Sequence, residues 1–214
     1  MDIPLRLPLF PLNLVLFPKM VLPLHIFEER YKSMIGRCIE KKIPFGMLLI
    51  TGDNLFDVGC SAEIVRVLER HGDGRIDILT EGRSRFRVRE FYHKEEFFQE
   101  ESHLEGLVEF FEDEPESVDN ALLEKTLASF KEVLKLGDHE TKVELDISQN
   151  PTDVSFFMSW SIGLDLAKKQ EILESVSTNY RLQEILEFLE GILDNSKKGD
   201  EIKSRVRGNG DLSD

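Results

Sequence analysis

The chain opens with the apolar segment Leu7-Pro-Leu-Phe-Pro-Leu-Asn-Leu-Val-Leu-Phe-Pro18, followed by Val21-Leu-Pro-Leu-His-Ile-Phe-Glu-Glu-Arg-Tyr31. Both segments are apolar enough for buried strands, but prolines interrupt them, and proline has no N–H group to donate to a neighbouring strand. The prolines therefore predict strand edges, bulges and corners. From Phe27 onward the apolar residues recur with a helical period, which predicts one amphipathic helix over residues 27–41.

The rest of the first half predicts short strands joined by tight turns. Strands are expected over residues 45–50, 61–70, 75–80, 84–91 and 108–112. Asp73-Gly74 is typical of a hairpin turn, and Glu81-Gly82 predicts another turn. Together with the N-terminal segments, this pattern predicts a barrel of six or seven strands with one short helix over residues 1–114.

After residue 114 the apolar pattern changes to a helical period. Helices are predicted over 118–134, from Asn150-Pro151 onward, over 168–173, and after Ser177. These helices predict a bundle over residues 115–195. Residues 196–214 are polar and have no period, which predicts a disordered tail. The predicted fold class is therefore α+β, a barrel followed by a helical bundle.

Composition limits the kinds of function. The 214 residues carry a formal net charge of −14, which disfavours binding of nucleic acid by the whole surface. We expect no membrane segment, because no apolar run reaches the length of a membrane helix, and the N-terminus does not resemble a signal peptide. Two cysteines, Cys38 and Cys60, are too few for a disulfide framework, so we expect a reducing, cytoplasmic setting.

The charge is unevenly distributed. Residues 95–124 contain twelve acidic residues and no Lys or Arg, whereas residues 66–94 contain eight basic and five acidic residues. The arginines of the predicted strand 84–91 and its flank alternate with apolar residues, which predicts four guanidinium groups on one face. These are Arg83, Arg85, Arg87 and Arg89. The favoured interpretation is that they pair with neighbouring carboxylates, and the alternative is a basic stripe that binds RNA.

Several segments resemble, in order and spacing, the N-terminal domain of Lon proteases, the substrate-recognition domain of that family. They are Leu7-Pro-Leu-Phe-Pro-Leu12, Phe17-Pro18, Leu22-Pro-Leu-His-Ile-Phe-Glu-Glu-Arg-Tyr31, Phe45-Gly-Met47, Val58-Gly-Cys60, Gly82-Arg-Ser-Arg-Phe-Arg87, Asn150-Pro-Thr-Asp153, Lys169-Gln-Glu-Ile-Leu-Glu174 and Tyr180-Arg-Leu182. The resemblance covers residues 5–193 and implies a PUA-like barrel. Lys19 departs from it, because the family usually has glycine after Phe-Pro. A non-glycine residue is tolerable there if its φ is negative.

The resemblance implies a stand-alone, non-enzymatic module that binds exposed hydrophobic segments of protein clients, or a proteolysis partner. No G-x-x-x-x-G-K-[ST] loop is present, so we expect no nucleotide and no cofactor. Binding is expected in a groove between barrel and bundle, or by strand addition at a proline-guarded edge. The candidate contact residues are Phe27, Tyr31, Phe97 and Phe98. The oligomeric state stays open.

Other chemically active residues favour structural interpretations. The five histidines, scattered from His25 to His139 with no pair at helical spacing, predict no metal site. Cys60 has no basic neighbour within two positions, which favours a buried, inert thiol. Phe156, Phe157, Met158 and Trp160 could form a recognition surface, but their helical spacing favours a packed core.

Overall fold

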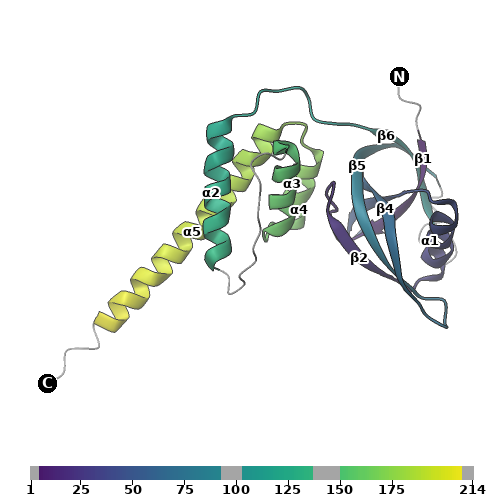
Figure 1. The fold of residues 1–214 in the computed structure, drawn as a ribbon, viewed down its shortest axis with the longest axis horizontal. Helices are drawn as coiled ribbons and strands as arrows, with labels where there is room; N and C mark the ends of the chain where they lie inside the picture. Colours follow the sequence, from purple (N-terminus) through teal and green to yellow (C-terminus); the bar gives the residue numbers. More distant parts are fainter. Residues whose placement is uncertain (1–4, 93–102, 137–149, 209–214) are drawn as a thin grey trace. The chain divides into compact units, whose positions relative to one another are not determined.

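The computed structural model describes residues 5–92, 103–136 and 150–208, with side chains up to residue 198. Within these ranges the chain is a mixed α+β protein with one six-stranded sheet and five helices (Figure 1). The elements are β1 (Leu5–Leu12), β2 (Val21–Ile26), α1 (Glu29–Lys41), β3 (Phe45–Thr51), β4 (Asn54–Arg70), β5 (Ile76–Tyr92), β6 (Leu104–Phe110), α2 (Asn120–Leu136), α3 (Pro151–Ser161), α4 (Leu166–Glu174) and α5 (Thr178–Gly208). None of the helices described is long and apolar enough to cross a membrane.

The chain divides into two compact units. The first contains Met1–Glu114 and Ser159–Val176, and the second contains Pro115–Met158 and Ser177–Asp214. The boundary after Glu114 coincides with the end of the predicted barrel, but the chain returns to the first unit over Ser159–Val176. Sequence periodicity identifies that stretch as helical and does not reveal which core it packs against, because an amphipathic helix can cover either one.

The strands of the first unit form a sheet that closes on itself. Their order is β2-β5-β4-β3-β1-β6, and β6 also pairs with β5. Five strands therefore make a hydrogen-bonded ring, while β2 pairs with β5 alone among the strands described. Ring closure removes most of the open strand edges that a flat sheet would expose.

The prolines of β1 and β2 lie where a strand has a partner on one side only, as their lack of an N–H predicts. β1 pairs with β6 over Leu5–Leu9 and with β3 over Leu9–Leu12, so Pro8 and Pro11 each have one neighbouring strand. Pro23 lies in β2, whose one partner within the described part of the chain is β5. The staggered pairing of β1 thus accommodates two prolines without breaking the ring.

The corner at Phe17-Pro18-Lys19-Met20 is a β-turn in which Met20 N donates to Phe17 O at 3.2 Å. Lys19 has a φ of 65°, so the condition under which a non-glycine residue is easily tolerated here, a negative φ, is not met. Proline at the second position and a positive φ at the third are features of a type II turn, which favours glycine there. The Lys19 N–H donates to Gly82 O at 2.7 Å, which helps to hold the residue in this conformation.

The predicted turn at Glu81-Gly82 is also wrong, because β5 continues through it as one strand, Ile76–Tyr92. Gly82 serves close packing instead. A Cβ atom there would overlap the carbonyl group of Phe17, and Gly82 N donates to Met20 O at 2.9 Å. A glycine can therefore mark the close approach of two backbones as readily as a turn.

Helix α1 begins at Glu29, two residues later than predicted, because Glu28 has extended backbone geometry. The helix buries Met34, Ile35 and Cys38, and these residues belong to its predicted apolar face. Lys42 ends it in the left-handed conformation, with its N–H donating to Cys38 O. This cap turns the chain directly into β3.

In the second unit the helix starts are capped as the sequence predicts. Asn150 Oδ1 accepts from Thr152 N at 3.0 Å, and Ser177 Oγ accepts from Tyr180 N at 3.1 Å. The core of this unit is mostly aliphatic and aromatic, and it also buries polar side chains such as Thr126, Ser155 and Arg181. It includes Leu123, Leu127, Phe130, Val154, Phe156, Met158, Leu182, Ile185 and Leu189. Phe156 and Met158 are thus buried, as the core interpretation of that cluster predicts, whereas Phe157 and Trp160 are only partly buried.

Helix α5 runs to Gly208, so the prediction of a disordered tail from residue 196 is wrong as far as residue 208. The segment Ser196–Arg207 contains three Lys, two Arg and one Glu, which are good helix formers. High intrinsic propensity lets a helix continue past the residues that bury its apolar face. Polarity alone therefore placed the end of this helix too early.

Candidate functional site

A groove of about 400 Å³ lies beside the end of α1 and the second half of β4. Its lining combines aliphatic side chains with charged ones. The lining residues are Cys38, Ile39, Lys42, Ile43, Glu63, Ile64, Val65, Arg66 and Val67. Ile43 is 40% exposed and Val65 is 44% exposed, so apolar surface is open to a ligand at this groove.

The groove follows a strand edge that is open. β4 pairs with β3 from Asn54 to Ala62, and with β5 as far as Arg70. Beyond Ala62, therefore, β4 has a neighbour only on the β5 side among the strands described. An unpaired edge presents backbone N–H and C=O groups that can hydrogen-bond to an additional strand.

Two β-bulges shape this edge. The pairing of β4 with β5 shifts between Ile64 and Arg66, and again between Val67 and Glu69. The additional residues are Val65 and Leu68, which are 44% and 47% exposed. A bulge bends its strand and redirects a side chain, and here it turns aliphatic side chains outward.

The sequence predicts an ordinary strand at residues 61–70 and misses these bulges. The sequence contains a signal of the bulges. In a strand with one buried and one polar face, apolar and polar residues alternate, but Ile64-Val65 and Val67-Leu68 are consecutive apolar pairs. Broken alternation can indicate either a bulge or a strand buried on both sides. Only the pairing of β4 with β5 decides between them.

The four candidate contact residues have different outcomes. Phe27 is 60% exposed, and its ring stacks on that of His25 with centroids 6.0 Å apart. Tyr31 is 3% exposed and packs edge-on against Phe10, so it belongs to the core and cannot serve as a surface contact. Burial raises the pKa of Tyr31 to about 12. Phe97 and Phe98 lie outside the described residues.

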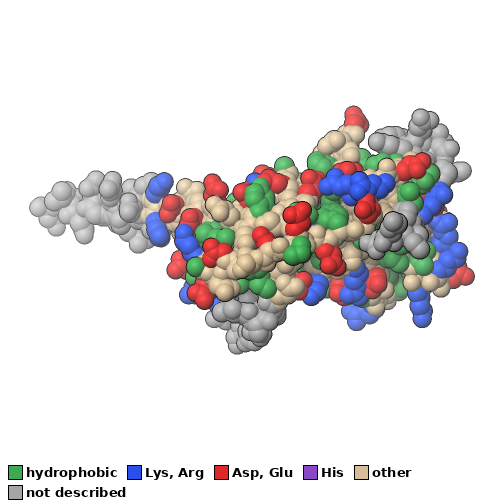
Figure 2. All heavy atoms as spheres, turned by 90° about the horizontal axis from the view of Figure 1, so that it is seen from above, with side chains coloured by type: hydrophobic (Ala, Val, Ile, Leu, Met, Phe, Trp, Pro, Cys, Tyr) green, Lys and Arg blue, Asp and Glu red, His purple; other side chains and the backbone are tan. Residues whose placement is uncertain are grey.

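The four arginines do not form one exposed stripe. β5 contains an irregularity between Gly82 and Arg85 and another between Val88 and Glu90, and each changes the phase of the strand. Each guanidinium has a carboxylate partner. The pairs are Arg83 with Glu63 and Glu81, Arg85 with Asp113, Arg87 with Asp57, and Arg89 with Glu109. Figure 2 likewise shows basic and acidic side chains next to each other over the face it presents.

Arg85 is a structural residue of the first unit and is 4% exposed. Its Nη1 donates to the carbonyl oxygens of Leu173, at 3.0 Å, and of Ser175, while Nη2 donates to Asp113 Oδ1 at 2.6 Å. Its guanidinium also lies over the ring of Phe111. Arg85 thus joins β5 to the end of α4 and to the segment after β6, and it cannot reach an external ligand.

Both cysteines are buried free thiols. Burial raises the pKa of Cys38 to about 11 and that of Cys60 to about 12, so both stay protonated at neutral pH. The interpretation of Cys60 as inert therefore agrees with its surroundings, and neither thiol is a candidate nucleophile.

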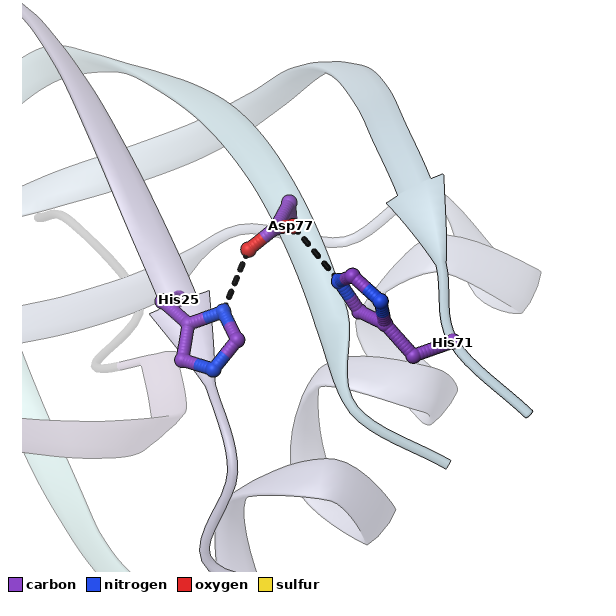
Figure 3. A group of neighbouring side chains, drawn as sticks. All are labelled: His25, His71 and Asp77. Carbon is purple, nitrogen blue, oxygen red and sulfur yellow. Dashed lines mark hydrogen bonds and ion pairs between the residues drawn. The ribbon is translucent and has the colours of Figure 1, made fainter. Parts of the chain in front are cut away.

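The sheet brings together three residues that could hold a metal ion (Figure 3). His25 Nδ1 lies 2.5 Å from Asp77 Oδ1, and His71 Nε2 lies 2.7 Å from Asp77 Oδ2. The hydrogen bonds from the two imidazoles lower the pKa of Asp77 below its usual value. Sequence spacing predicts no metal site because His25 and His71 are distant in the chain; β2 and the β4–β5 turn make them neighbours.

The sequence matches the family described as the ATP-dependent protease La (LON) substrate-binding domain over residues 6–191. Among curated relatives, the Lon protease of Buchnera aphidicola is 29% identical over 219 residues, and that of Rhizobium meliloti is 28% identical over 212 residues. These alignments cover 95% and 94% of this chain. They cover only 27% and 26% of the two relatives, so the chain spans about a quarter of their length.

Two solved structures share the fold. The Lon N-terminal domain protein from Xanthomonas campestris superposes with a TM-score of 0.67 at 22% identity, covering 85% of this chain and 97% of that one. The N-terminal domain of the Mycobacterium avium complex Lon protease gives a TM-score of 0.59 at 16% identity, covering 86% and 98%. At these identities the likeness concerns the fold alone.

Proposed function

Because this chain belongs to the family of the ATP-dependent protease La (LON) substrate-binding domain, we propose that it is a recognition module that binds exposed apolar segments of protein clients. The observation that carries the proposal is the apolar groove beside the open edge of β4. Its action is binding without chemical turnover. The client binds as an extended chain, and it contacts both the groove and the strand edge.

Two kinds of contact support this mode of binding. Backbone groups of β4 beyond Ala62 can pair with any extended chain, because main-chain hydrogen bonds do not depend on side-chain identity. Alternate side chains of that chain point to one face and can contact Ile43 and Val65. This combination selects for apolar, extended segments and tolerates many sequences, as a domain that recognises unfolded clients requires.

The charged residues at the groove support reversible binding. Lys42, Glu63 and Arg66 line it together with the aliphatic residues. Charges at an open strand edge are a common means of preventing permanent pairing with other edges. The groove is therefore suited to transient clients rather than to a permanent partner.

The proposal includes finer statements about the protein's setting. The partner is a client protein or a protease that degrades such clients, and the protein acts in the cytoplasm, where buried reduced thiols such as Cys38 and Cys60 are usual. The closed sheet is of the PUA-like type, and the helices of the second unit form a bundle. Phe27 adds exposed aromatic surface and stays a proposed contact.

The test measures binding of a fluorescent, permanently unfolded and apolar polypeptide by anisotropy. The double variant Ile43→Asp plus Val65→Asp is expected to weaken binding by about tenfold or more, since it removes two aliphatic contacts and adds charge. Leu136→Asp is the matched control, because Leu136 is an exposed aliphatic residue of α2 outside the groove. Its affinity should equal that of the wild type.

Two results would contradict the proposed site. Either the double variant binds the polypeptide as tightly as the wild type, or Leu136→Asp loses as much affinity. A single-stranded RNA tested in parallel addresses the alternative function. Tight RNA binding that weakens steeply with salt and is lost on combining Arg83→Ala, Arg87→Ala and Arg89→Ala would favour that alternative.

A further inference from the structure

We propose that His25, His71 and Asp77 form a binding site for a divalent transition-metal ion, with Zn²⁺ as the best match. All three ligand atoms lie within 4.8 Å of one another. Two imidazoles and one carboxylate are a ligand set that zinc uses when water or another ligand fills the fourth position. The same set disfavours Mg²⁺ and Ca²⁺, which take oxygen ligands.

The geometry requires only side-chain adjustment. In a tetrahedral zinc site with ligand distances of about 2.0–2.1 Å, donor atoms lie about 3.3 Å apart. The nitrogen–oxygen distances here are shorter, at 2.5 Å to Asp77 Oδ1 and 2.7 Å to Asp77 Oδ2, because a hydrogen bond draws its two heavy atoms closer together than a metal ion between them does. The ring of His25 is nearly half exposed and can rotate outward. The ion then takes the place of the two hydrogen bonds.

The nitrogen atoms that would not bind the ion also have suitable surroundings. His71 Nδ1 lies 3.7 Å from Glu69 Oε1, and a carboxylate beside the second ring nitrogen is typical of metal-binding histidines. On binding, each imidazole changes tautomer, so that its proton moves to this second nitrogen. In His25 this second nitrogen is Nε2. Its ring stacks against Phe27 and is open to solvent, so water can accept a hydrogen bond from the Nε2 proton.

The three ligands come from three parts of the first unit. His25 lies in β2, Asp77 in β5, and His71 in the turn between β4 and β5 (Figure 3). β2 pairs only with β5, so it lacks support on its other side among the described strands. A bound ion would link β2 to the turn as well as to its partner strand, and would thereby stabilise this end of the sheet.

The experiment titrates the purified chain with zinc chloride and follows binding by calorimetry. Wild type is expected to bind one Zn²⁺, and the unfolding temperature should rise by about 3 °C at a free Zn²⁺ concentration tenfold above Kd. Magnesium chloride should produce neither effect. Co²⁺ bound in place of Zn²⁺ should give the visible absorption of a four- or five-coordinate ion.

Variants locate the ion. His25→Ala, His71→Ala and Asp77→Asn should each weaken Zn²⁺ binding by more than about 100-fold, because substitutions beyond the ligands themselves already cost about 10–100-fold. Asp77→Asn preserves side-chain volume, and circular dichroism checks that each variant is folded. His103→Ala is the control, since His103 contacts Glu105 and Arg37 elsewhere in the first unit.

Three results would overturn the assignment. Wild type binds no Zn²⁺ up to about 1 mM, the three ligand variants bind as tightly as wild type, or His103→Ala abolishes binding. None of these results bears on client binding, because His25, His71 and Asp77 do not line the groove. Failure of the metal site and failure of the proposed function are therefore distinguishable.

Discussion

The backbone geometry of one residue, Lys19, shapes the corner that follows Phe17. Lys19 has a positive φ and is held between the turn at Phe17 and the carbonyl of Gly82. An L-residue in this conformation carries a steric cost that glycine avoids. The corner therefore stores local strain at Lys19, and the rest of the first unit compensates for it.

Replacing Lys19 by glycine should stabilise the protein by about 0.5 kcal/mol. Relief of strain amounts to about 1–2 kcal/mol, and the greater freedom of glycine in the unfolded chain offsets about 0.4–1 kcal/mol of it. Lys19→Val should instead destabilise by about 1 kcal/mol or more, because β-branched residues avoid positive φ. Urea unfolding measures both changes.

The control is Lys131→Gly in the interior of α2, which should destabilise by about 1 kcal/mol. Glycine is thus expected to have opposite effects at two exposed lysines. Equal effects at Lys19 and Lys131, or an unchanged stability for Lys19→Val, would show that the backbone at Lys19 is unstrained.

Strand β5 shows how bulges place residues at every second position on different faces of a strand. Arg83, Arg85, Arg87 and Arg89 would share one face of a regular strand, but two irregularities change the phase between them. Arg85 is buried, in contact with Leu173, Ser175 and Asp113, whereas Arg83 and Arg89 are exposed. Four chemically identical side chains thus have different roles.

Arg85→Ala should destabilise the protein by about 3 kcal/mol or more. The change removes the Arg85 donor from the partly buried Asp113 and from two backbone carbonyls, and breaking a buried ion pair on one side typically costs about 3–5 kcal/mol. Arg83→Ala is the control and should change stability by less than about 1 kcal/mol, because its ion pairs are exposed. Thermal or urea unfolding of both variants gives the comparison, and similar losses would refute the structural role of Arg85.

At the scale of the whole molecule, the first unit is built from two separate stretches of chain. Ser159–Val176 adds buried side chains such as Ile172 and Leu173, together with the carbonyl groups that Arg85 contacts. Gln170 Nε2 also donates to Val58 O in β4 at 3.0 Å. The core of the first unit is therefore incomplete without a segment that lies far along the sequence.

A fragment of residues 1–114 should unfold without a cooperative transition and should bind a dye specific for exposed apolar surface. It lacks the side chains and carbonyl groups that Ser159–Val176 supplies, and it leaves Arg85 partly unpaired. Joining residues 159–176 to it through a Gly/Ser linker should restore cooperative unfolding in urea. A fragment 1–114 as stable as the linked form would show that the segment contributes nothing.

The candidate site was only partly predictable. Phe27 is exposed, so its role as a client contact stays a prediction. Tyr31 is buried and cannot be such a contact, because a tyrosine on the apolar face of a helix has the same local pattern whether its ring is buried or exposed. Val65 and Leu68 were missed, because their exposure depends on how β4 aligns with β5 and on nothing within β4.

The residue pattern alone predicts the family, the mixed α+β class, the helix caps at Asn150 and Ser177, and the one-sided pairing of the prolines. These features depend on local chemistry, namely periodicity, capping side chains and missing N–H groups. The bulges, the burial of Arg85 and the meeting of His25 with His71 and Asp77 appear only in the folded chain. Each of these depends on register between strands distant in the chain, and a one-residue shift in register exchanges buried and exposed faces.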